Sequence, residues 1–177
     1  MHHGGENKAL FLFSQKTYEQ INKQLKTTFE INGVAHFGEN IILSAVTEND
    51  ICIGDIYQLG EARIQITQPR QPCWKLSANT NKKEMTKFIF QSGLTGCYAK
   101  VLEEGFITVN DTLILEKRDY PNISIKKLNK LIINPLYDEK IMEEALSCKE
   151  LGKPFYKSLF QRYKLKDKDD QFTFYHK

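Results

Sequence analysis

The stretch with the clearest potential for chemistry is QPRQPCWKL, in which Cys73 directly follows the second of two prolines and lies close to two cations. Arg70 precedes the cysteine by three residues, and Lys75 follows it by two. Nearby cations favour the thiolate, the form of cysteine that binds metals and attacks electrophiles. Because each proline fixes its own φ angle, we expect the segment to be stiff enough to hold a ligand. The alternative is an inert buried thiol with two surface cations beside it.

Two further segments combine glycines with polar side chains that could contact an anion or a heterocycle. HHGG, near the start of the sequence, contains His3, Gly4 and Gly5, and adjacent glycines let the backbone approach a ligand and expose its N–H groups. FGENI contains Asn40, whose amide can donate and accept hydrogen bonds. A flexible chain start and an ordinary Asx-type turn are the respective alternatives.

The other three cysteines, Cys52, Cys97 and Cys148, are widely scattered and form no CxxC pair, which argues against a structural zinc site. We expect them to be free thiols that pack as small hydrophobic residues in a reducing compartment. The sequence has no apolar run of the roughly 20 residues that a membrane span needs, and it lacks a secretory signal. These features predict a cytoplasmic protein without a membrane partner.

Composition is that of an ordinary globular protein, with 41% hydrophobic and 27% charged residues among 177. The formal net charge of +3 argues against general nucleic-acid binding. Residues 117–177 hold 14 of the 25 Lys and Arg residues but only 9 of the 22 Asp and Glu residues. This basic bias indicates a solvated helical surface.

The surrounding elements follow from hydrophobic spacing. Residues 8–14 and 51–68 have the apolar content or alternation of strands, and Thr17 is expected to cap a helix that begins at residue 18. Further segments are assigned as a strand at the end of 35–43, a helix over 82–93, strands within 97–118, and helices over 124–135, 137–148 and 153–164. The pattern predicts a mainly β fold with α: a β-barrel-like domain over 1–120, with inserted helices, followed by a helical segment over 121–177.

Taken in order, HGGENKAL, FGENI, CIGDIYQLGEARIQITQPRQPCWKL and GLTGCYAKVLEEGFI resemble the MOSC domain, the family named after the C-terminal part of molybdenum-cofactor sulfurase. The helical end resembles the three-helix segment of one bacterial branch of that family. The resemblance implies a MOSC-like β-barrel that binds a molybdenum–pterin cofactor, with Cys73 as the molybdenum ligand or as a sulfur carrier. It also implies further cofactor contacts, at Arg70, Asn40, His3, Gly4 and Gly5, and at Ser14 toward the pterin phosphate. Lys75 joins them only as a neighbouring cation.

Members of that bacterial branch are associated with the reduction of N-hydroxylated compounds, such as hydroxylamino compounds and base analogues. The sequence shows no flavin, haem or Fe–S motif, so electrons would come from a partner reductase that carries a flavin or Fe–S centre. Two alternatives stay open. One is a sulfur-carrier or cofactor-delivery protein that uses a Cys73 persulfide, and the other is a non-catalytic module whose helical end docks a partner.

In the family, the HGG element usually follows several dozen residues that contain the first strands of the domain. In this sequence it begins at residue 3. We therefore expect a barrel without those strands, whose unpaired edges a second copy of the chain could cover in a homodimer, or whose cofactor binding is impaired.

Overall fold

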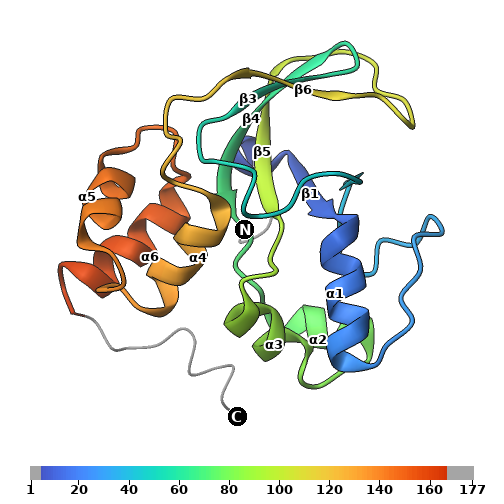
Figure 1. Ribbon diagram of the computed structural model, residues 1–177, viewed down its shortest axis with the longest axis horizontal. Coiled ribbons are helices and arrows are strands. Elements are labelled where there is room, and N and C mark those ends of the chain that lie inside the picture. The colour runs from blue at the N-terminus through green and yellow to red at the C-terminus, as the bar shows by residue number, and fades with distance from the viewer. Residues whose placement is uncertain (1–4, 167–177) are drawn as a thin grey trace.

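The computed structural model describes residues 5–166, in which a six-stranded mixed sheet is flanked by two groups of helices (Figure 1). The strand order across the sheet is β2-β1-β5-β4-β3-β6. The strands are β1 (Leu10–Ser14), β2 (Ile41–Leu43), β3 (Ile56–Leu59), β4 (Ala62–Pro69), β5 (Cys97–Glu103) and β6 (Leu113–Lys117). The helices are the 3-10 turn η1 (Glu6–Lys8), α1 (Gln15–Leu25), α2 (Trp74–Thr80), α3 (Met85–Ser92), α4 (Ile125–Ile133), α5 (Glu139–Ser147) and α6 (Lys153–Tyr163).

The sheet curls into a half-barrel rather than closing. β1 pairs with β2 in parallel, and the other neighbours pair antiparallel. The register between β4 and β5 shifts between Ile66 and Gln68, and such bulges bend a sheet and increase its twist. This mixed, curled sheet with its six α-helices confirms the predicted fold class.

Alternation along the strands gives the sheet two apolar faces. Leu12 and Ile66 point into one buried cluster together with residues of β3. Phe11, Phe13 and Tyr98 point to the opposite face, where the first two are buried and Tyr98 is half-buried against α1 and α3. Phe11 and Tyr98, which belong to the candidate site described below, lie on this second face.

The three helices α4–α6, called here the C-terminal helices, pack around their own apolar centre, which contains Leu128, Met142 and Phe155. They gather at one side of the strands, away from α1–α3 (Figure 1). Ser124 and Asp138 cap α4 and α5 by accepting backbone N–H bonds, as their positions ahead of apolar runs favour. All three predicted helices are confirmed, although residues 167–177 lie outside the described part of the chain.

One local prediction was wrong, and one short helix was not predicted. Thr17 does not cap α1, because the helix begins at Gln15 with Ser14 at the cap position. Thr17 instead lies inside the helix, fully buried, and donates to the Glu48 carboxylate at 2.9 Å. The short helix α2 was not predicted, because its seven residues are too few to show a hydrophobic period.

The open side of the half-barrel carries a groove of about 180 Å³, lined by Leu10, Leu59 and Val101 among others. Near it, on the β5–β6 connection, Phe106 and Val109 are 84% and 90% exposed. Within residues 5–166, no helix has the length and apolar character needed to cross a membrane.

Candidate functional site

Cys73 lies where β4 leads into α2, in an extended conformation with φ −138° and ψ 170°. Two hydrogen bonds hold the segment. The Thr86 hydroxyl of α3 donates to the Cys73 carbonyl at 3.0 Å, and the backbone N–H of Arg70 donates to the Gly96 carbonyl at 3.2 Å. Cys73 is partly exposed, whereas the other three cysteines are buried. The thiol that the sequence singled out is therefore the one that a ligand can reach.

Two cations and two aromatic rings line the sheet beside this cysteine. The Lys8 Nζ atom lies 5.6 Å from the centre of the Tyr98 ring. Tyr98 packs against Phe11 with ring centres 5.2 Å apart, and the Arg70 guanidinium carbon lies 5.3 Å from the centre of the Phe11 ring. Burial lowers the pKa of Lys8, because a charged amine is poorly solvated there.

Tyr98 lies near both Arg70 and Cys73. Burial raises the pKa of Tyr98 most, the Arg70 charge opposes that shift, and Cys73 adds to it. Both residues are thus close enough to Tyr98 to act on its charge. We call Cys73, Arg70, Lys8, Tyr98 and Phe11 the thiol cluster. The cluster contains one sulfur atom, two cationic side chains and a protonated phenol, and the Tyr98 and Phe11 rings form its aromatic surface.

The glycine-rich segment reaches the same place. Gly5 adopts φ +100°, a conformation that favours glycine, and its carbonyl accepts from the Lys8 N–H at 2.8 Å to close the turn η1. The Thr67 hydroxyl of β4 donates to the Asn7 carbonyl at 2.6 Å, which holds the turn against the sheet. His3 and Gly4 lie outside the described residues.

Asn40 supports the thiol cluster from the other side of β1. Its backbone N–H donates to the Phe11 carbonyl at 2.9 Å, and its side-chain oxygen accepts from the Phe11 N–H at 2.8 Å. The structure thus shows Asn40 fixing the strand residue whose ring lies under Arg70. The Asn40 residue is itself exposed at the start of β2.

Ser14 and Lys75, the two least specific sequence candidates, differ in position. Ser14 ends β1, and its hydroxyl is buried without a hydrogen-bond partner among the described residues. Such an orphaned group calls for an explanation, and a bound ligand is one. Lys75 lies exposed in the first turn of α2.

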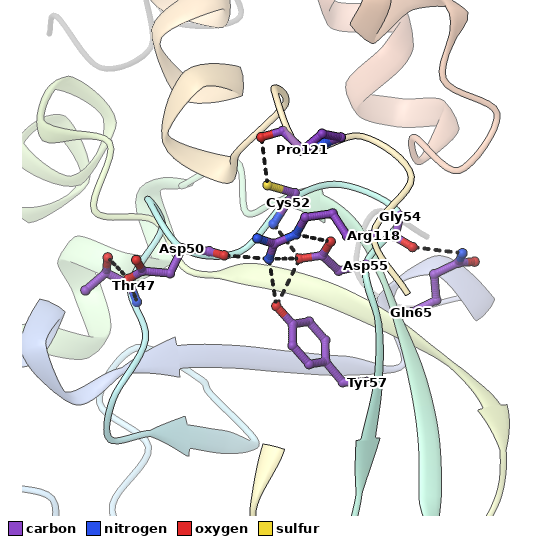
Figure 2. Close-up of polar contacts among 9 residues, drawn as sticks. All are labelled: Thr47, Asp50, Cys52, Gly54, Asp55, Tyr57, Gln65, Arg118 and Pro121. Carbon is purple, nitrogen blue, oxygen red and sulfur yellow. Dashed lines mark hydrogen bonds and ion pairs between the residues drawn. The ribbon is translucent and has the colours of Figure 1, made fainter. Parts of the chain in front are cut away.

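A second polar cluster, around Asp55, is closed and fully paired (Figure 2). The Asp55 carboxylate, which has no exposed surface, accepts from the Cys52 N–H at 2.8 Å, the Tyr57 hydroxyl at 2.9 Å and the Arg118 guanidinium at 2.7 and 2.8 Å. Arg118 also donates to the Asp50 carbonyl at 2.7 Å. We call Asp55, Arg118, Tyr57 and Cys52 the ionic cluster. It ties the start of β3 to the segment that leads into α4.

The sequence did not identify Lys8, Tyr98 or Phe11 as site residues. Lys8 lies within the HGGENKAL stretch, three residues after Gly5, and this position was the available signal. Tyr98 and Phe11 are ordinary strand residues in sequence. Only the pairing of Phe11 with Tyr98 across β1 and β5 places their rings together.

Comparison with known proteins gives a consistent family. The MOSC domain model matches residues 1–114. A Bacillus subtilis (strain 168) protein named YflK is 33% identical over 166 residues, which cover 92% of this chain and 72% of YflK.

Two further relatives extend this similarity. The crystal structure of YiiM from Geobacillus stearothermophilus superposes with a TM-score of 0.82 at 32% identity, covering 90% of this chain and 80% of that one. A Gibberella moniliformis (strain M3125 / FGSC 7600) protein named reductase is 29% identical over 131 residues. That match covers 73% of this chain but only 23% of the reductase.

Proposed function

The chain belongs to the MOSC domain family, and on this premise we propose that it binds a molybdenum cofactor at the thiol cluster and reduces N-hydroxylated compounds. The observation that carries the proposal is the meeting of a partly exposed thiol, Cys73, with the cations Arg70 and Lys8 on an aromatic surface. These groups come from three separate sequence segments, and the fold brings them to one face.

The residues present fit the chemistry of a molybdenum–pterin group. A thiolate is a soft ligand for a transition metal, and Cys73 would supply it. The pterin phosphate favours guanidinium and ammonium donors, which Arg70 and Lys8 offer. Ser14 ends β1 on the Leu12 face of the sheet, opposite the Phe11 ring, so its hydroxyl is not part of this cluster. The flat Phe11 and Tyr98 rings suit contact with a planar heterocycle.

The bound cofactor would supply the redox step, in which two electrons and two protons cleave an N–O bond and release water. The protein's part is to bind, orient and protonate. Arg70 and Lys8 would neutralise anionic groups, and an anion beside Lys8 would favour its charged form against the cost of burial. Tyr98, whose pKa is raised by burial, keeps its hydroxyl proton at neutral pH and can donate a hydrogen bond to the substrate.

Electrons would come from a separate protein with a flavin or Fe–S centre. The name of the Gibberella relative agrees with a reductive reaction, but this chain matches only 23% of that much longer protein. The electron donor and the N-hydroxylated substrate therefore belong to the proposal.

The decisive experiment is molybdenum and pterin analysis of the protein after expression in a host that makes the cofactor. We expect about one molybdenum per chain in the parent protein and its loss in Cys73→Ala. Cys148→Ala, which removes a buried thiol, is the matched control and should keep the metal. Equal metal content in Cys73→Ala and the parent protein would rule out the proposed ligand.

The same samples distinguish the alternative that Cys73 carries sulfur. Intact-mass analysis would then show one additional sulfur on the parent protein, labile to cyanide and absent from Cys73→Ala, without stoichiometric molybdenum. The partial exposure of Cys73 is the observation that favours this second candidate. Absence of both metal and extra sulfur would leave the non-catalytic alternative.

A further inference from the structure

We propose that the C-terminal helices position the segment that carries Arg70 and Cys73, with Ser158 of α6 and Gln71 as the positioning residues. This inference rests on the proposed function only in assigning the segment its task. The contact itself is independent of any cofactor: the Gln71 side-chain nitrogen donates to the Ser158 hydroxyl at 3.0 Å. Gln71 lies between Arg70 and Cys73 in sequence, so this bond anchors the middle of the segment to α6.

A second contact fastens the strand end that precedes the segment. The Gly152 N–H, at the cap of α6, donates to the Thr67 carbonyl of β4 at 2.9 Å. Gly152 also packs so closely on Gln68 that an added Cβ atom would overlap the Gln68 side-chain oxygen. A glycine at this position therefore lets α6 begin directly against β4.

Packing between these contacts is tight. The residues 70–72 face α3, α4 and α6 across a void of only about 10 Å³, lined by Pro72, Ile132 and Phe155 among others. That volume is at most the space of one water molecule. Residues 70–72 therefore pack closely against these helices while the Gln71–Ser158 bond is made.

The segment is also held by the main sheet and by α3, through Gly96 and Thr86. The cysteine segment is thus clamped between the half-barrel and the C-terminal helices. Pro69 and Pro72 stiffen it but cannot place it, since proline fixes a local angle and not a distance. We infer that α6 supplies the missing constraint and sets how Arg70 and Cys73 face the aromatic surface.

The protein contains its own reporter for this positioning. Trp74, the only tryptophan in the sequence, follows Cys73 directly and is 62% exposed. Its fluorescence anisotropy reports the mobility of the cysteine segment, and hydrogen exchange of residues 70–80 reports its opening. Both measurements use metal-free protein, so they test the clamp even if the proposed reaction is wrong.

The experiment compares Ser158→Ala with Ser147→Ala. Each change removes one serine hydroxyl that donates to a carbonyl of its own helix, Pro154 for Ser158 and Glu144 for Ser147. Only Ser158 also contacts Gln71. We expect Ser158→Ala to lower the Trp74 anisotropy and to speed exchange of residues 70–80 about fivefold to tenfold, the effect of one lost hydrogen bond. Ser147→Ala should leave both unchanged.

Gln71→Ala breaks the same bond from the other side and decides the matter if Ser158→Ala does not fold. If the two residues act through one bond, the double variant should be no more mobile than the single variants. In cofactor-loaded protein, both single variants should retain less molybdenum than Ser147→Ala. The proposal is overturned if Gln71→Ala leaves anisotropy and exchange at parent values, or if Ser147→Ala changes them equally.

Discussion

The ionic cluster and the thiol cluster are built from the same kinds of residue and differ in how they are closed. Each contains a cysteine, a tyrosine and an arginine, grouped as Cys52, Tyr57 and Arg118 in one and Cys73, Tyr98 and Arg70 in the other. In the ionic cluster, the Asp55 carboxylate neutralises the arginine and binds the tyrosine hydroxyl (Figure 2). In the thiol cluster, Arg70 and Lys8 lie against aromatic rings.

The difference separates a structural role from a binding role. A buried carboxylate with four donors already has the partners it needs, so the ionic cluster has nothing left to offer a ligand. Lys8 and the partly exposed Cys73 can each gain from contact with an anionic or metal-bearing group. The same residue types therefore stabilise the fold in one region and form the proposed site in the other.

The largest expected effect is at the ionic cluster. Arg118→Met leaves the Asp55 carboxylate buried without its cation and should lower the free energy of unfolding by about 3 kcal/mol. This is the low end for a buried pair, because the Arg118 side chain is 30% exposed. Urea denaturation measures the change. Arg63→Met, which breaks exposed pairs to Glu103 and Glu116, should have a much smaller effect. Equal losses would show that the ionic cluster stabilises the fold no more than an exposed ion pair does.

Thiol labelling sharpens the contrast between Cys73 and Cys52. Burial raises the pKa of Cys52 and Cys97, and raises that of Cys148 to about 11, so these thiols are both shielded and protonated. We expect iodoacetamide at pH 8 to modify Cys73 at least about tenfold faster than any of them. Peptide mass spectrometry measures the rates. In guanidinium chloride all four should react alike, and uniform labelling of the native protein would contradict the assignment.

The buried thiols also predict how stability depends on pH. A thiol whose pKa is raised by folding keeps its proton above pH 9, where the unfolded chain loses it, so its stabilising effect is complete below that pH and declines above it. We expect the free energy of unfolding to fall by about 1 kcal/mol per pH unit for each such thiol between pH 9 and 10. Urea titrations should show a shallower fall for Cys148→Ala. An unchanged slope would mean that Cys148 ionises freely in the folded protein.

The smallest effect is expected at the cysteine that we assign to function. Cys73→Ser should change the free energy of unfolding by no more than about 0.5 kcal/mol, because Cys73 is partly exposed and serine is a favourable residue at the cap of α2. Thermal and urea unfolding test this. A loss as large as that of Arg118→Met would make Cys73 a structural residue and undo the comparison.

The sequence anticipated those parts of the fold that depend on local pattern. The apolar alternation within residues 51–68 predicted strands where β3 and β4 lie, and the helix expected over 82–93 corresponds to α3. Thr17 was misassigned because its partner, Glu48, lies 31 residues away. A side chain that bonds to a distant carboxylate has no signature in its own neighbourhood.

The candidate site follows the same division. Cys73 and Arg70 could be selected from sequence, since a thiol, two prolines and two cations lie within one short stretch. Lys8 and Tyr98 could not, because they become neighbours only when η1 packs on β4 and β5. The task of Gln71 was also hidden, since its partner Ser158 is 87 residues away.

The sequence by itself therefore determined the reactive group, its stiff segment and most of the helices and strands, because these depend on residue types and spacings within a few turns of chain. The tertiary structure alone decided which cations and rings surround that group and which helix holds it in place. Such contacts depend on strand register and helix packing, which join residues far apart in sequence at distances that no local pattern encodes.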